Sequence, residues 1–307
     1  MAEVLSGFVV IAAIALVGLI TARIGVLGDT ATAVLSKLTM TIGLPALVFT
    51  VVSRSHLSDI FSVTGLVAAI SGIMMMAVFA LAGSFARWGA ASTTIGSLAS
   101  GLVNSTNLGV PISTYLFGDV TAVTAIMLFQ LSILTPIALT LLDFMTGRGD
   151  RSRPWRMLLV PVRNPVTVTA LVAIAFNLLG IHLPPLAMAP VELLGQLSVP
   201  VMLLLFGMSL MQAKVRVPRP DRLPVALSIT LKSLVQPAVA YVLARWVFHL
   251  EDSVVFVCVA CAALPTAQNV VVCATRYNVG LNIARTSAIV TTVLTIPLLL
   301  AAVALLT

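Results

Sequence analysis

Long apolar segments separated by short charged loops constrain this chain more than any other feature of its sequence. The segments lie at roughly 4–22, 32–53, 60–82, 93–117, 120–143, 165–181, 187–211, 223–246, 253–277 and 284–306. A helix needs about 20 apolar residues to cross the hydrocarbon core of a bilayer. Only 9% of the residues are charged, which is too few to cover a soluble surface. The sequence therefore predicts an all-α polytopic membrane protein with about ten transmembrane helices.

The distribution of positive charge predicts the orientation of these helices. If the N-terminus lies outside, the inner loops hold twelve Lys and Arg residues and the outer loops hold only Arg54 and Arg245. Cytoplasmic loops carry the excess of Lys and Arg in membrane proteins. We therefore expect both termini to be periplasmic or extracellular. The net charge of +7 has the same explanation, and loops without interleaved aromatic residues do not indicate nucleic-acid binding.

Motifs for metal, cofactor or enzyme chemistry are missing from the sequence. The three cysteines, Cys258, Cys261 and Cys273, fall in one apolar segment, and no second pair or nearby histidine completes a zinc site. The sequence has no phosphate-binding loop, no HExxH motif and no nucleophile–base arrangement. We predict a protein that is not an enzyme and that has no metal site and no cofactor.

An internal repeat relates the two halves of the chain. Three prolines of the first half have counterparts 154 to 161 positions later: Pro45 and Pro200, Pro111 and Pro265, and Pro136 and Pro297. Each half holds five predicted spans, so the second copy must run through the membrane in the opposite direction. Inverted repeats of this kind recur in secondary transporters. The predicted repeats are residues 1–147 and 164–307, joined by a basic cytoplasmic loop at 148–163.

Polar residues interrupt the fourth span where the middle of the bilayer should lie. The residues are Asn104, Ser105, Thr106 and Asn107, followed by Gly109 and Pro111. A continuous helix facing lipid has no use for them, so we expect the helix to break here. Gly109 would allow an irregular backbone, and Pro111 would suit the first turn of a new half-helix.

The ninth span has a matching group of residues, Pro265, Thr266, Gln268 and Asn269. Pro265 would again suit a first helical turn, and Gln268 and Asn269 would supply amides in the middle of the membrane. The sequence therefore predicts two broken helices, the fourth and the ninth.

Two half-helices that start near the midplane would form a site for an anion. Each start exposes unpaired N–H groups and carries a partial positive charge of roughly half a unit. A carboxylate is the simplest ligand for such a site. The alternative is that the amides only tie helices together. The predicted substrate-binding residues are Asn104, Thr106, Asn107, Gly109, Pro111, Pro265, Thr266, Gln268 and Asn269.

Two lysines in the spans are candidates for tuning the charge of this site. Lys232 lies about 13 Å into the eighth span, at 1.5 Å per residue, where a charge is costly. We interpret it as a counter-charge to the substrate or as the partner of a carboxyl group. The alternative is a structural cation bonded to carbonyls freed by Pro237. Lys37, near the inner end of the second span, either takes part in the site or extends to the membrane surface.

Several landmarks together resemble the auxin efflux carrier family, whose bacterial members include permeases for malonate and related organic acids. The landmarks are Asn164-Pro165, Gly207 to Leu210, Asn107 to Pro111 followed by Leu116-Phe117-Gly118, Lys232 ahead of Pro237, and Pro265 to Asn269 before Arg276-Tyr277. The resemblance implies a scaffold of helices 1, 2, 6 and 7 and a transport core of helices 3–5 and 8–10. It also implies that helices 4 and 9 cross at the substrate, that Lys37 matches a basic position of plant members, and that scaffolds pair in a homodimer.

We therefore predict a permease of the bacterial inner membrane that moves a small organic anion, such as malonate, by alternating access, with or without a coupled proton. One alternative is a sodium-coupled symporter of the bile-acid type, although the acidic sodium ligands of those relatives have no clear match beside Gln268 and Asn269. A second alternative is a channel or membrane sensor without turnover.

Overall fold

The computed structural model describes residues 2–28, 30–54, 63–146, 165–181, 183–210 and 217–306. These ranges are almost entirely helical, and their one isolated backbone bridge joins Val103 and Thr266. The basic loop predicted at 148–163 lies outside the described residues, as do Lys214 and Arg216.

Five helical stretches of the described ranges are long and apolar enough to cross a bilayer. They are Ala31–Arg54, Val63–Phe85, Pro185–Ser209, Arg219–Val247 and Leu281–Leu306. Other apolar segments appear as shorter helices, because irregular backbone divides some of them. The structure is thus that of an all-helical membrane protein.

The chain divides into two compact units, and each unit combines stretches from both halves of the sequence. Unit 1 comprises Met1–Ser62, Thr106–Ile133 and Leu158–Ala213, and unit 2 comprises Val63–Ser105, Leu134–Met157 and Lys214–Thr307.

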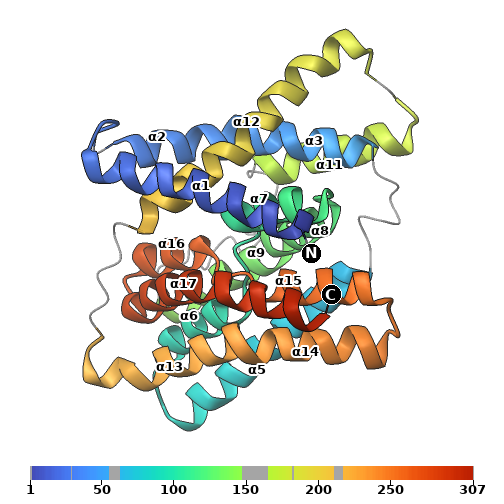
Figure 1. Ribbon diagram of the computed structural model, residues 1–307. Coiled ribbons are helices and arrows are strands. Elements are labelled where there is room, and N and C mark those ends of the chain that lie inside the picture. The colour runs from blue at the N-terminus through green and yellow to red at the C-terminus, as the bar shows by residue number, and fades with distance from the viewer. Residues whose placement is uncertain are drawn as a thin grey trace. The chain divides into compact units, whose positions relative to one another are not determined.

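Unit 1 is held together by close packing of long helices (Figure 1). Its main helices are α1 (Ala2–Ile24), α2 (Ala31–Leu38), α3 (Leu44–Arg54), α7 (Val110–Ile112), α8 (Thr121–Phe129), α11 (Pro165–Leu178) and α12 (Pro185–Leu210). Helix α12 packs on α1 and α3, and α3 also packs on α11. Glycines allow the α1–α12 contact, since a Cβ atom on Gly207 would lie 1.8 Å from the Ala15 carbonyl oxygen. Small residues at helix contacts are the usual means of close packing in membranes.

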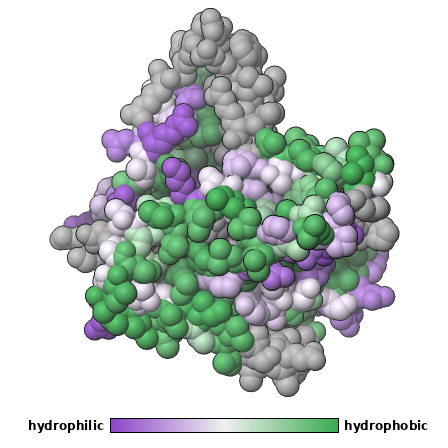
Figure 2. Space-filling view, turned by 90° about the horizontal axis from the view of Figure 1, so that it is seen from above, coloured by the Kyte–Doolittle hydropathy of each residue, from purple (hydrophilic) through white to green (hydrophobic). Residues whose placement is uncertain are grey.

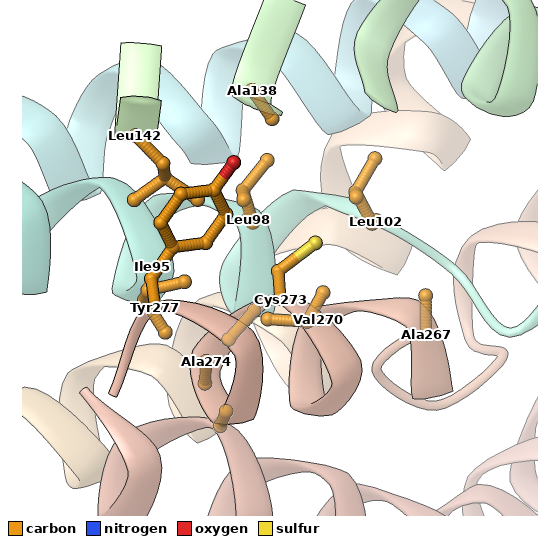
Figure 3. Close-up of a cluster of buried hydrophobic side chains, with 12 residues drawn as sticks. Ile95, Leu98, Leu102, Ala138, Leu142, Ala267, Val270, Cys273, Ala274 and Tyr277 are labelled. Carbon is orange, nitrogen blue, oxygen red and sulfur yellow. The ribbon is translucent and has the colours of Figure 1, made fainter. Parts of the chain in front are cut away.

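Unit 2 carries the two helix breaks described below. Its helices are α5 (Val63–Phe85), α6 (Ala90–Gly101), α9 (Thr135–Thr146), α13 (Arg222–Thr230), α14 (Gln236–Val242), α15 (Asp252–Ala262), α16 (Gln268–Tyr277) and α17 (Leu281–Leu306). Helix α17 packs on α6, α13, α15 and α16, and α5 packs on α6, α14 and α15. Figure 3 shows an apolar cluster in which Leu98 of α6, Leu142 of α9 and Cys273 of α16 meet.

Four π-helical turns each end two residues before a proline. The turns are η1 (Thr39–Gly43) before Pro45, η2 (Ser105–Gly109) before Pro111, η4 (Gln130–Leu134) before Pro136 and η7 (Leu231–Val235) before Pro237. Proline has no N–H group for the i−4 carbonyl, and its ring clashes with that carbonyl. A wider π turn relieves the clash without ending the helix. These prolines therefore shape helices that continue through them.

The surface of the described residues is rich in apolar side chains. Figure 2 shows broad hydrophobic areas with smaller hydrophilic areas between them. Phe85 is 86% exposed, Leu81 is 60% exposed and Leu16 is 54% exposed. Soluble monomers rarely expose contiguous apolar surface of this kind, so lipid is the natural solvent of these helices.

Candidate functional site

Two non-helical segments of unit 2 pair with each other inside the predicted spans. Helix α6 ends at Gly101 and the chain becomes helical again at Ser105, whereas α15 ends at Ala262 and α16 begins at Gln268. The Asn104 N–H donates to the Pro265 carbonyl oxygen at 2.7 Å, and the Ala267 N–H donates to the Leu102 carbonyl oxygen at 3.1 Å. We call these paired segments, residues 102–104 and 263–267, the crossover.

The predicted fourth span breaks, but not at the position expected from Gly109 and Pro111. Gly109 has helical angles, with φ −61° and ψ −49°, and the irregular backbone lies earlier, at residues 102–104. The prediction failed because η2 accommodates Pro111 within a continuous helix. The position of the break depends instead on the pairing partner, which satisfies the backbone groups that leave the helix.

The ninth span breaks close to the predicted place, but Pro265 does not stand in the first turn of the new helix. Pro265 belongs to the crossover, and α16 begins three residues later at Gln268. The residue before a proline avoids helical angles, which favours a non-helical Leu264. Pro265 itself has only a carbonyl to offer, and that carbonyl accepts the Asn104 N–H.

Side chains close the carboxyl ends of α6 and α15. The hydroxyl of Thr266 donates to the Ala99 carbonyl oxygen at 2.8 Å. The hydroxyl of Thr295 donates within α17 to the Thr291 carbonyl oxygen at 2.8 Å and lies 3.3 Å from the Ala263 carbonyl oxygen. The last carbonyls of a helix have no partner within the helix and cannot stay unpaired in an apolar interior. The Thr266 hydroxyl therefore allows α6 to end away from water.

Lys232 belongs to the same set of caps. The side chain is fully buried, with 0% exposure, in the π turn η7. Its Nζ atom donates to the Ala262 carbonyl oxygen at 3.0 Å and to Gln236 Oε1 at 2.6 Å. Gln236 in turn donates through Nε2 to the Gly101 carbonyl oxygen at 3.3 Å. The carbonyl bonded to Lys232 thus lies on α15 and is not one that Pro237 frees in its own helix.

The amino end of α16 differs from these closed carboxyl ends. No side chain caps it at Ala267. Gln268 and Asn269 are half-buried, and within the described residues neither side-chain amide has a hydrogen-bond partner. A helix amino end carries partial positive charge and outward-pointing N–H groups. This end can therefore bind an anion, with two amides beside it.

The remaining candidate residues divide between the units. Unit 2 brings Asn104, Pro265 and Thr266 together at the crossover, next to Gln268 and Asn269. The others belong to unit 1, where Thr106, Gly109 and Pro111 are buried, Asn107 is half-buried and Lys37 of α2 is exposed.

Apart from Lys232, the members of two polar stripes near the crossover were missed in the sequence. Ser228, Lys232 and Gln236 follow one another at intervals of four, and so do Ser287, Thr291 and Thr295 of α17. Residues four apart share one face of a helix. The stripes meet where Ser287 donates to Ser228 at 3.1 Å, and Thr291 Oγ1 accepts the Thr266 N–H at 3.0 Å. The four-residue spacing inside apolar segments was the signal that could have revealed them.

Apolar helices with a paired break in their interior define a multi-pass membrane protein. The model of the family described as Membrane transport protein matches residues 4–303, nearly the whole chain. The protein therefore belongs to this family, the auxin efflux carrier family, whose members are membrane transporters and not enzymes. A comparison with curated proteins finds no match.

Proposed function

We propose that this transporter is a secondary carrier that moves a small organic anion, such as malonate or another carboxylate, by alternating access. The amino end of α16 carries the proposal, because it offers N–H groups and two unpaired side-chain amides in the middle of an apolar segment. Groups of this kind are costly to bury without a ligand or water to bind. An anion of carboxylate size would satisfy them.

The polarity of the crossover supports an anion rather than a cation as the substrate. The helix carboxyl ends, which attract cations, are already bonded to Lys232, Gln236 and Thr266. The amino end of α16, which attracts anions, has no such cap. The amino end of α16 is therefore the part of the crossover that is left to bind a ligand, and its partial positive charge favours an anion.

We also propose the ten-span architecture with two inverted five-helix repeats. Unit 1 contains α1 to α3, α7, α8, α11 and α12, and unit 2 contains α5, α6, α9 and α13 to α17. This division supports separate scaffold and core bodies for all of these helices except α7 and α8, which belong to the predicted core but lie in unit 1. The breaks after α6 and α15 support the repeat, since each interrupts the matching span of its half. Pairing of scaffolds in a homodimer and placement in a bacterial inner membrane with outside termini are part of the same proposal.

Uptake by proteoliposomes tests the anion site. Gln268→Ala and Asn269→Ala should each raise the KM for radiolabelled malonate by about 10- to 100-fold, because a hydrogen bond to a charged group contributes roughly 1.5–3 kcal/mol. Gln196→Ala, at an exposed glutamine of α12, is the matched control and should leave KM unchanged.

Two further readouts of the same experiment decide the proposal. If both amide variants are folded and take up malonate and other organic acids like the wild type, the α16 site is not the substrate site. Preloaded vesicles should show counterflow, since a carrier exchanges substrate across the membrane. Uptake without counterflow, together with single-channel currents, would indicate a channel instead.

A further inference from the structure

We propose that the Lys232 ammonium group is a built-in cation that takes the place of a bound metal ion at the crossover, so that the protein binds its anion without sodium. The inference rests on the function proposed above, and it concerns the helix carboxyl ends at the crossover rather than the α16 amides. In this proposal the Lys232 ammonium group neutralises the partial negative charge of the helix-end carbonyls, as a bound and exchangeable cation otherwise would.

The contacts of Lys232 are those of a cation held by oxygen atoms. Its Nζ atom lies 3.0 Å from the carbonyl oxygen of Ala262, the last residue of α15. The second oxygen is Oε1 of Gln236 at 2.6 Å. Carbonyl and amide oxygens are also the ligands that hard cations use in proteins. The ammonium group therefore occupies a position lined by two oxygen atoms of the kind that bind cations.

Gln236 extends this arrangement to the second broken helix. It is fully buried, with 0% exposure, and its Nε2 atom donates to the carbonyl oxygen of Gly101, the last residue of α6. Accepting from Lys232 at Oε1 polarises the amide, which strengthens its donation at Nε2. One ammonium group thus acts on the carboxyl ends of two helices.

The charges of this group balance. A helix carboxyl end carries roughly half a negative charge, so two ends together carry about one. One ammonium group neutralises that charge without an additional ion. The positive amino end of α16 then keeps its full attraction for an anion.

Chemical rescue of a Lys232→Ala variant tests this role without any substrate. The variant should lose roughly 5–10 °C in apparent Tm, because it empties the cation position and leaves the Ala262 carbonyl unpaired. Propylammonium, which has the charge and nearly the shape of the missing group at about pH 7, should restore about 3–5 °C at ten times its Kd. The neutral isostere 1-propanol should restore nothing.

Matched controls define the result that overturns the proposal. Wild-type protein and a Lys37→Ala variant, at an exposed lysine, should not respond to propylammonium. An equal response of Lys232→Ala to propanol would show a neutral hydrogen-bond donor rather than a cation. No response to propylammonium would also overturn the assignment.

A second measurement applies even if Lys232→Ala does not fold. The shift in Tm that malonate causes in the wild type should be the same when N-methylglucamine replaces all sodium and potassium. A shift that requires sodium would overturn the inference while leaving the anion carrier intact. If no organic acid shifts Tm in either buffer, the proposed function fails, and the rescue experiment still decides the role of Lys232.

Discussion

Replacing Thr266 of the crossover with valine should destabilise the protein more than the same change at an exposed threonine of α16. The side chain is fully buried, with 0% exposure, and its hydroxyl is the cap of the Ala99 carbonyl at 2.8 Å. Valine has nearly the same shape, so packing is preserved and the lost bond dominates. The backbone bond from the Thr266 N–H to Thr291 Oγ1 remains, because the substitution does not touch it.

The expected loss of stability follows from the Ala99 carbonyl, which the substitution leaves without its donor. A buried carbonyl that loses its donor costs about 1–3 kcal/mol. At about 2–4 °C per kcal/mol for a chain of this size class, Thr266→Val should lower the apparent Tm by roughly 2–12 °C. The assay is thermal unfolding of purified protein at one fixed scan rate, since unfolding of such proteins is governed by rates.

Thr275→Val is the matched control for this prediction. Thr275 is exposed on α16, and its hydroxyl donates to the Val271 carbonyl within the same helix at 2.8 Å. That carbonyl keeps its helical N–H partner, so the control should change Tm by less than about 2 °C, in line with surface substitutions. Equal losses in Thr266→Val and Thr275→Val would refute the reasoning that the crossover hydroxyl caps a helix end.

Two other substitutions probe the packing and the polar network. Gly207→Ala should lower the free energy of unfolding by about 1–3 kcal/mol, because its Cβ atom would lie 1.8 Å from the Ala15 carbonyl oxygen. The yield of folded protein and the Tm should fall accordingly. A melting curve like that of the wild type would contradict the α1–α12 contact. Gln236→Leu should lower the free energy of unfolding by about 3–5 kcal/mol, more than Thr266→Val does, since it removes a partner from both Lys232 and the Gly101 carbonyl. The melting curve of the variant measures this loss. A smaller loss than in Thr266→Val would contradict the linked arrangement of Lys232, Gln236 and Gly101.

The class of the protein could be predicted from the sequence because its amino-acid composition decides whether water or lipid surrounds its surface. Apolar segments and scarce charge indicate lipid whatever the tertiary structure is, and the landmarks that indicated the family are matched by a family model over residues 4–303. The presence of breaks in the predicted fourth and ninth spans could also be predicted. Burying a polar amide such as that of Asn104 or Gln268 in lipid costs free energy, so these residues indicate a function or an irregular backbone.

The exact break positions were not predictable from local sequence. Pro111 was expected to start a half-helix, yet a π turn accommodates it, and the break lies where residues 102–104 find partners at 265–267. Such a pairing joins segments more than 150 positions apart, and no local preference encodes it. The capping role of Thr266 could not be predicted for the same reason, since only the fold brings its hydroxyl to the Ala99 carbonyl.

The caps of α6 have a consequence for how the protein is made. Its last carbonyls are satisfied by Gln236, Thr266 and Ala267, all of which are synthesised well over a hundred residues after Gly101. Until those residues emerge from the ribosome, the end of α6 has no protein partners and cannot rest in hydrocarbon. The fourth span must therefore wait beside water, the insertion machinery or a chaperone, and its final burial is one of the last steps of biogenesis.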